Sequence, residues 1–111
     1  DDFARKHSLV CLLKDHRTAV SRGNGEVYLN TTGNSGMATG GSGDVLSGII
    51  GGILAQNRNG ELSALDVAIL SAYIHGLAGD IAADKLGEYS LMASDIIDTL
   101  PKAIKSLCSI Q

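Results

Sequence analysis

The first third of the chain carries apolar blocks that are typical of short strands. Ser8 to Leu13 is a nearly continuous apolar run, as in a strand that is buried on both faces. After a polar break, a short β-like segment at Thr18 to Ser21 and an alternating segment at Glu26 to Leu29 follow. The Gly-Asn-Gly sequence within Arg22 to Gly25 is a strong turn signal. The pattern therefore predicts strands in this part of the chain.

The rest of the chain has the periodicity of three helices. Between Gly41 and Asn57 the spacing is helical, with apolar residues at Val45, Leu46, Ile49, Ile50, Ile53 and Leu54. Within it, Gly48 and Gly52 leave a smooth patch that we expect to pack closely against a sheet or a helix.

A second helix is predicted to start at Ser63, which forms a capping-box pattern with Asp66. One face of this helix carries Leu65, Ala68, Ile69, Ala72, Gly76 and Gly79. A third helix follows Ser94, and we expect Pro101 to kink or restart it. Strands that precede three helices do not alternate with them, as they would in a complete doubly wound sheet. We therefore expect residues 1–111 to form a single partial domain of a larger α/β unit.

Length and charge narrow the class of protein. The chain has 111 residues, enough for one domain at most, and a net charge of −3. A chain this acidic lacks the positive charge that is typical of nucleic-acid-binding proteins. Its two cysteines lack metal or redox spacing, and no secretory signal is present. The longest apolar stretch reads as too short to span a membrane, so we expect a cytoplasmic protein. The start at Asp1 suggests a processed product, a trimmed chain or a fragment.

The segment from Asn30 to Asp44 carries the clearest chemical signal. It places five glycines, two asparagines and one carboxylate directly before a helix. Glycines let backbone amides approach a ligand, and the helix N-terminus adds partial positive charge, so the segment predicts a phosphate site. A carboxylate beside a bound anion is repelled by it, which indicates that Asp44 serves as a general base or through a metal ion.

Two common phosphate motifs do not fit this segment. No Gly-Lys-Ser/Thr follows as in a Walker A loop, and Leu46 stands where the dinucleotide fingerprint needs its third glycine. The alternative without function is a loop that turns tightly into a helix. Asp44 would then only compensate the helix dipole, which is worth about 0.5 kcal/mol.

The segment from Asn30 to Gln56, with Asn-Ser-Gly-Met and Gly-Gly-Ser-Gly-Asp within it, closely resembles the signature of the ADP- or ATP-dependent NAD(P)H-hydrate dehydratases. These enzymes belong to the ribokinase-like superfamily. Three further segments also resemble this family and follow one another in the same order as its motifs: Leu13-Lys14, His75 to Asp80 and Ala93 to Asp95. The resemblance implies an α/β fold, namely the C-terminal part of a ribokinase-like three-layer α/β/α sandwich with few strands followed by three helices.

The resemblance also implies a reaction, the repair of damaged nicotinamide cofactor. Family members remove water from the 6-hydroxy hydrate of NADH or NADPH and use ADP or ATP, with Mg²⁺ expected, to drive the step. Asp44 matches the catalytic aspartate, which would bind the hydrate and take the proton of its C6 hydroxyl as that oxygen attacks the terminal phosphoryl group. The amides of Gly41, Ser42 and Gly43 would bind the nucleotide and form an anion hole. Phosphate then leaves and the ring double bond is restored.

A second nucleotide contact is implied near the start of the chain. The run Lys14, Asp15, His16, Arg17, Thr18 matches the family's Lys-Gly-x-x-Thr stretch, which lies against the nucleotide phosphate and ribose. Asp15 departs from the pattern because it adds a side chain and a negative charge where glycine is expected. Arg17 could offset this charge.

Four further polar residues are less specific. Asn34 and Thr39 are candidates to orient the phosphate or the hydrate, and loop-stabilising hydrogen bonds are the alternative. A lone histidine among small neighbours, such as His75, is more often a hydrogen-bonded core residue than a ligand. Asp80 follows His75 by five residues and does not share its helical face well. Neither residue is predicted to form a metal site.

The family's domain is more than twice as long as this chain, and its N-terminal half supplies most of the sheet. We therefore expect the 111 residues alone to be inactive. We also expect an unfinished sheet edge and apolar helix faces to cause homo-oligomerisation or association with the missing half. Two alternatives stay open: a small-molecule kinase of the same superfamily, and a nucleotide-binding module or fragment without catalysis.

Overall fold

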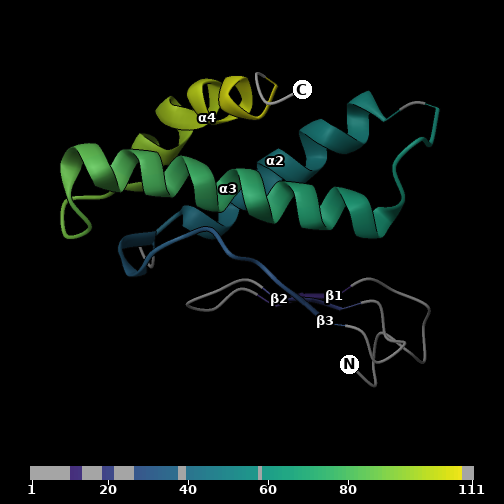
Figure 1. Ribbon diagram of the computed structural model, residues 1–111, viewed down its shortest axis with the longest axis horizontal. Helices are drawn as coiled ribbons and strands as arrows, with labels where there is room; N and C mark the ends of the chain where they lie inside the picture. The colour runs from purple at the N-terminus through teal and green to yellow at the C-terminus, as the bar shows by residue number, and fades with distance from the viewer. Residues whose placement is uncertain (1–10, 14–18, 22–26, 38–39, 58, 109–111) are drawn as a thin grey trace.

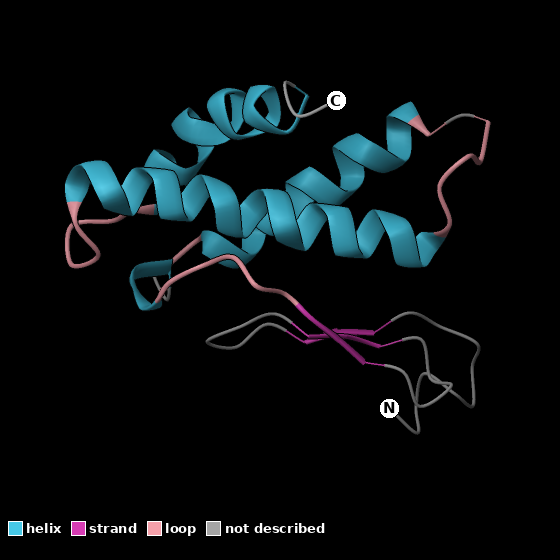
Figure 2. Cartoon of the chain, viewed as in Figure 1, coloured by secondary structure: helices cyan, strands magenta, loops and turns pink. Residues whose placement is uncertain are grey.

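The computed structural model describes residues 11–13, 19–21, 27–37, 40–57 and 59–108. The elements in chain order are β1 (Cys11–Leu13), β2 (Ala19–Ser21), β3 (Val27–Leu29), a 3₁₀ helix η1 (Ser35–Met37), α2 (Ser42–Gln56), α3 (Ala64–Leu86) and α4 (Ala93–Cys108). In Figures 1 and 2 the strands lie below α3 and α4 lies above it, while α2 begins below α3, passes behind it and ends above it. The predicted order of strands followed by three helices is confirmed.

The three strands form one antiparallel sheet in the order β1-β2-β3. Residues 19–21 of β2 pair with both neighbours, so that Cys11 faces Ser21 and Ala19 faces Leu29. Val20 at the centre is only 1% exposed, because it packs with Leu65 and Ala68 of α3. The sheet is therefore attached to the start of α3.

A second core joins the three helices. Its buried members come from η1, α2, α3, the α3–α4 connection and α4: Met37, Val45, Ala78, Ala82, Leu91, Ile96 and Ala103. Ala78, Ile96 and Ala103 are completely buried. Alanines at these positions let the helix axes approach closely, so that α3 can serve as the central helix.

Helix α3 begins as the sequence predicts. The Ser63 hydroxyl accepts a hydrogen bond from the amide of Asp66 at 3.0 Å, and the Asp66 carboxylate accepts one from the amide of Ser63 at 3.2 Å. With 23 residues, α3 is long and apolar enough to cross a membrane. The expectation that no apolar stretch has this length was therefore wrong. Its most apolar stretch is 56% buried against the rest of the protein, as in a core helix.

Two local expectations are also corrected. Pro101 does not restart the third helix, because α4 continues through it to Cys108, and a kink at Pro101 stays a prediction. The buried residues Ile96 and Ala103 on either side hold both halves against the core, which offsets the missing backbone hydrogen bond. Gly48 and Gly52 do not pack against anything in the described structure, since a Cβ at either position would meet no atom within 4 Å.

Candidate active site

At the N-terminus of α2, the first backbone amides have no hydrogen-bond acceptor among the described residues. Gly41 caps this helix with φ +90°, a conformation that favours glycine, and no side chain caps the helix. The first hydrogen bond of the helix runs from the amide of Val45 to the carbonyl of Gly41 at 3.1 Å. The preceding amides have no acceptor within the helix. The predicted anion hole of Gly41, Ser42 and Gly43 therefore lies where the helix dipole is positive.

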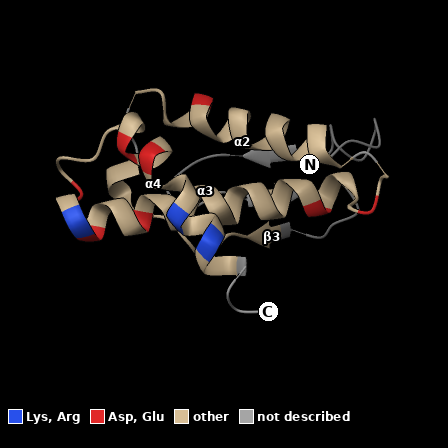
Figure 3. Cartoon of the chain, turned by 90° about the horizontal axis from the view of Figure 1, so that it is seen from above, with Lys and Arg blue, Asp and Glu red and all other residues tan. Residues whose placement is uncertain are grey.

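Asp44 lies in the first turn of α2, and its side chain is exposed. It is the only charged residue between Ser42 and Gln56, so one acidic position marks this end of an otherwise uncharged helix (Figure 3). No residue in the described ranges forms a hydrogen bond or ion pair with its carboxylate. A substrate can therefore reach the predicted base.

The side chain of Ser42 points away from this exposed end. Ser42 is fully buried, and its Oγ lies 3.2 Å from Nε2 of His75, which is itself only 2% exposed. This confirms the interpretation of His75 as a hydrogen-bonded core residue. It also leaves the backbone amide as the group that Ser42 offers to a ligand.

The segment between β3 and α2 is fastened to α3. Asn30 Nδ2 donates to the carbonyl of Ala72 at 2.9 Å, and Thr32 Oγ1 donates to the carbonyl of Tyr73 at 3.0 Å. Gly76 makes this approach possible, because a Cβ there would collide with Thr32. The sequence predicted a face of small residues on α3, but not that this segment covers it.

Asn34 uses both ends of its amide inside the protein. Its Nδ2 donates to Asp80 Oδ1 at 2.9 Å, and its Oδ1 accepts from the amide of Gly36 at 3.0 Å. Asp80 Oδ2 also accepts from the amide of Gly33 at 2.9 Å. These are the loop-stabilising bonds that the sequence left as the alternative. Direct contact between Asn34 and a ligand stays a prediction.

Sequence reasoning missed the part played by Asp80. One signal could have found it, since Asp80 follows the small, buried Gly76 by four residues and so lies on the same helical face. A carboxylate in that position needs donors from a neighbouring segment.

The remaining predicted site residues cannot be placed. Lys14, Asp15, His16, Arg17 and Thr18 lie outside the described residues, as does Thr39. Their contacts with a nucleotide or hydrate stay predictions. Within the described ranges, no group of three or more His, Cys, Asp or Glu side chains is placed to hold a metal ion.

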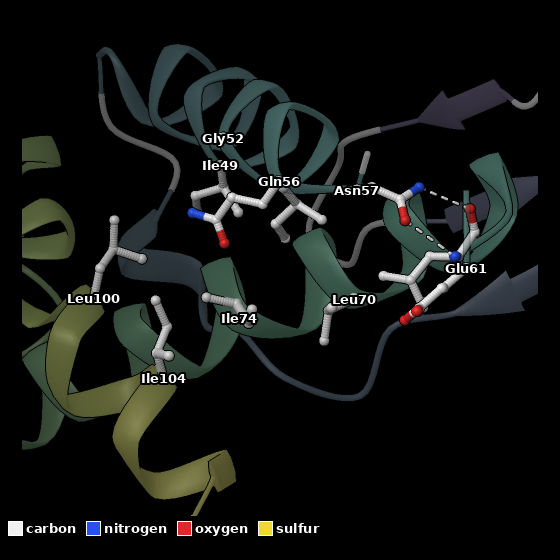
Figure 4. Close-up of a pocket in the computed structure, with 11 residues that line it drawn as sticks. Ile49, Gly52, Gln56, Asn57, Glu61, Leu70, Ile74, Leu100 and Ile104 are labelled. Atoms are coloured by element: carbon white, nitrogen blue, oxygen red, sulfur yellow. Dashed lines mark hydrogen bonds between the residues drawn. The ribbon is translucent and has the colours of Figure 1, made fainter. Parts of the chain in front are cut away.

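An apolar groove of about 500 Å³ opens away from Asp44, between the C-terminal half of α2 and the neighbouring faces of α3 and α4 (Figure 4). Its walls include Ile49 and Ile53 of α2, Ile74 of α3 and Ile104 of α4. Among the described residues that line it, Glu61 is the only charged one. The groove is therefore an apolar surface and not a phosphate site.

Comparisons with known proteins agree with this geometry. The sequence profile of the NAD(P)H-hydrate dehydratases matches residues 1–102. The bifunctional NAD(P)H-hydrate repair enzyme Nnr of Moorella thermoacetica is 47% identical over 95% of the chain, and the ADP-dependent (S)-NAD(P)H-hydrate dehydratase of Cenarchaeum symbiosum is 43% identical over 93%.

Among solved structures, the ADP/ATP-dependent NAD(P)H-hydrate dehydratase of Bacillus subtilis, co-crystallised with ATP/Mg²⁺, superposes on 95% of the chain with a TM-score of 0.83 and 30% identity. The chain spans only 19%, 34% and 36% of the lengths of these three proteins, in the order given. The described residues thus share the fold of the corresponding part of a dehydratase. The chain belongs to the NAD(P)H-hydrate dehydratase family.

Proposed function

We propose that this chain is the part of an ADP- or ATP-dependent NAD(P)H-hydrate dehydratase that holds the terminal phosphate of the nucleotide and supplies the catalytic base. The observation that carries the proposal is the exposed carboxylate of Asp44 in the first turn of a helix whose terminal amides have no acceptor among the described residues. The names of the relatives specify the hydrate and the adenine nucleotide as their ligands.

The arrangement accounts for a phosphoryl transfer followed by an elimination. Asp44 accepts the proton of the C6 hydroxyl as that oxygen attacks the terminal phosphorus, and the shortened nucleotide leaves. The amides of Gly41 to Gly43 stabilise the charge that develops on the phosphoryl oxygens. The C6–O bond of the phosphorylated hydrate then breaks with help from the lone pair of the ring nitrogen, and phosphate departs. Loss of a proton from C5 restores the double bond.

Mg²⁺ fits this site as an ion that accompanies the nucleotide. Magnesium usually keeps several waters and binds through substrate phosphates with one or two carboxylates. Asp44 is a carboxylate in the first turn of α2, where the phosphate site is predicted. When bound, the ion neutralises phosphate charge and so reduces the repulsion between Asp44 and the nucleotide.

We further propose that the chain forms a three-layer α/β/α sandwich together with a further region, which corresponds to the part of its longer relatives that the chain does not match. The open glycine face of α2 and the apolar groove support this, because both are surfaces without a packing partner in the described structure. Leu54 on α2 is 51% exposed and Ile104 on α4 is 45% exposed, which is costly for large apolar side chains in water.

The proposed activity is tested on the complete polypeptide that carries residues 1–111. Incubation with NADH hydrate, Mg²⁺ and ADP or ATP should regenerate NADH, which is followed by its absorbance, with one phosphate released per turnover. A stable phosphorylated product without NADH would favour the kinase alternative. Absence of any turnover with either nucleotide would refute the proposal.

Residues 1–111 in isolation are expected to give no measurable dehydration. The chain supplies an anion hole and a base, but the larger part of the enzyme that would enclose the hydrate lies outside it. The same absorbance assay checks this, with the complete polypeptide as the positive control. Recovery of NADH by the isolated chain would show that the site is complete without the rest.

The isolated chain is also expected to associate through its uncovered apolar surface. Size-exclusion chromatography should give a mass well above the 11.5 kDa of a monomer at high concentration. Ile104→Glu places a charge in the groove and should shift the peak toward the monomer. Leu86→Glu is the matched control, because Leu86 is 44% exposed but lies outside the groove lining. A monomeric wild-type chain would contradict the expectation.

A further inference from the structure

The carboxylate of Asp80 connects α3 to the segment that leads into the site. One oxygen accepts the backbone amide of Gly33 and the other accepts the side-chain amide of Asn34, both at 2.9 Å. Asp80 is partly buried at these contacts, where hydrogen bonds to a charged acceptor are stronger than neutral ones. Both oxygens are therefore used to hold one short stretch of backbone.

Asn34 passes this restraint on to the following turn. Its side-chain oxygen accepts the amide of Gly36, which lies in η1, and the backbone carbonyl of Asn34 accepts the amide of Met37 at 3.1 Å. Met37 is buried in the core that α2 shares with α3. The chain then reaches Gly40 and Gly41 within a few residues. The restraint from Asp80 thus extends to Met37, which packs in the same core as Val45 of α2.

Helix α3 restrains the other side of the site as well, because His75 bonds to Ser42 in the first turn of α2. The two contacts on α3 lie five residues apart in sequence. One rigid helix consequently sets the spacing between the Asn30–Met37 segment and the anion hole.

We propose that Asp80 is a positioning residue for the dehydration reaction, which it serves by fixing Gly33 and Asn34 against α3 so that the segment before α2 keeps the geometry of the site. This inference rests on the proposed function. Asp80 acts through Asn34 and touches neither substrate nor nucleotide. Misplacement of reacting groups by about 1 Å can cost roughly 100-fold in rate, so a restraint of this kind has a measurable effect.

The test is an exchange of the two side chains in the complete polypeptide. Asp80→Asn turns an amide nitrogen toward one of the two donors, and Asn34→Asp sets two carboxylates against each other. In the double variant Asn34→Asp/Asp80→Asn, the new amide at position 80 donates to the new carboxylate at position 34. Its oxygen can still accept from Gly33, and the carboxylate at position 34 can still accept from Gly36.

Each single variant is expected to lower kcat for hydrate dehydration by roughly 10- to 100-fold, and the double variant is expected to recover most of that loss. The dissociation constant for the nucleotide, measured by calorimetry, should change much less than kcat, because a small displacement that misaligns the reacting groups still leaves the hydrogen bonds to the phosphate formed. Asp84→Asn, one turn further along α3 at an exposed position, is the matched control and should behave as wild type.

Three results would overturn the proposal. The first is that the single variants keep the wild-type kcat, even if their melting temperature is lower. The second is a double variant that is as impaired as the single ones, which also decides the matter if the single variants do not fold. The third is an inactive wild-type polypeptide, which contradicts the proposed function and this inference together. An active wild type with unaffected variants contradicts the role of Asp80 alone.

Discussion

Replacing Asp44 by asparagine in the complete polypeptide should lower kcat for hydrate dehydration by about 10²- to 10⁴-fold, the usual contribution of a general base. The amide has nearly the same shape as the carboxylate, so the first turn of α2 should stay intact. It cannot accept the proton of the C6 hydroxyl, and the attacking oxygen therefore stays a poor nucleophile. The rate of NADH regeneration measures the effect.

Nucleotide binding separates this explanation from a general loss of structure. With Mg²⁺ left out, removing a negative charge beside the proposed anion hole should leave the affinity for ADP unchanged or increase it, as measured by calorimetry. Asp98→Asn on α4, an exposed carboxylate that is not among the predicted site residues, is the control and should retain full activity. An Asp44→Asn enzyme with undiminished kcat would show that another group is the base.

Gly76→Ala is expected to destabilise the protein by roughly 1–3 kcal/mol, as overpacking of a close contact does. A Cβ at position 76 would overlap Thr32, with the backbone carbonyl carbon of Thr32 only 2.7 Å away. The backbone of the segment would have to move and would strain the hydrogen bond from Thr32 to Tyr73. The higher helix propensity of alanine, about 1 kcal/mol, offsets only part of this cost.

Gly79→Ala provides the matched comparison on the same face of α3. A Cβ at position 79 would meet the side-chain sulfur and methyl group of Met37, which can change rotamer, and no backbone atom is among its nearest neighbours. Its effect on the midpoint of thermal or denaturant unfolding should therefore be smaller than that of Gly76→Ala. The reverse order would mean that the segment does not lie on α3 as described.

The sequence was most informative where the signals are local. The apolar period of α2 and the Ser63–Asp66 capping box each depend on residues a few positions apart. Their physical causes are burial of one helix face and satisfaction of the first amides of a helix. The same holds for Asp44, because its place in the first turn follows from where the helix begins. The turn predicted at residues 22–25 lies outside the described residues.

The contacts between distant segments could not be predicted in this way. Asp80 and Asn34 are 46 residues apart. Nothing in this spacing predicts that a carboxylate on α3 will contact a side-chain amide in the segment before α2. The small residues of α3 predicted a close approach but not its partner. Gly48 and Gly52 carried the same signal, yet no described residue covers them. Pro101 shows that tertiary packing can outweigh a local preference.

The attachment of the Asn30–Met37 segment to α3 also bears on how the protein folds. Its hydrogen bonds join residues 41 to 47 positions apart, so each requires closure of a long stretch of chain. Such contacts bring no gain until α3 exists as a surface to receive them, because the entropy of closure comes first. The N-terminal end of α2, where we propose that phosphate binds, should consequently take its final shape late in folding. It should also loosen early on heating, before the helical core gives way.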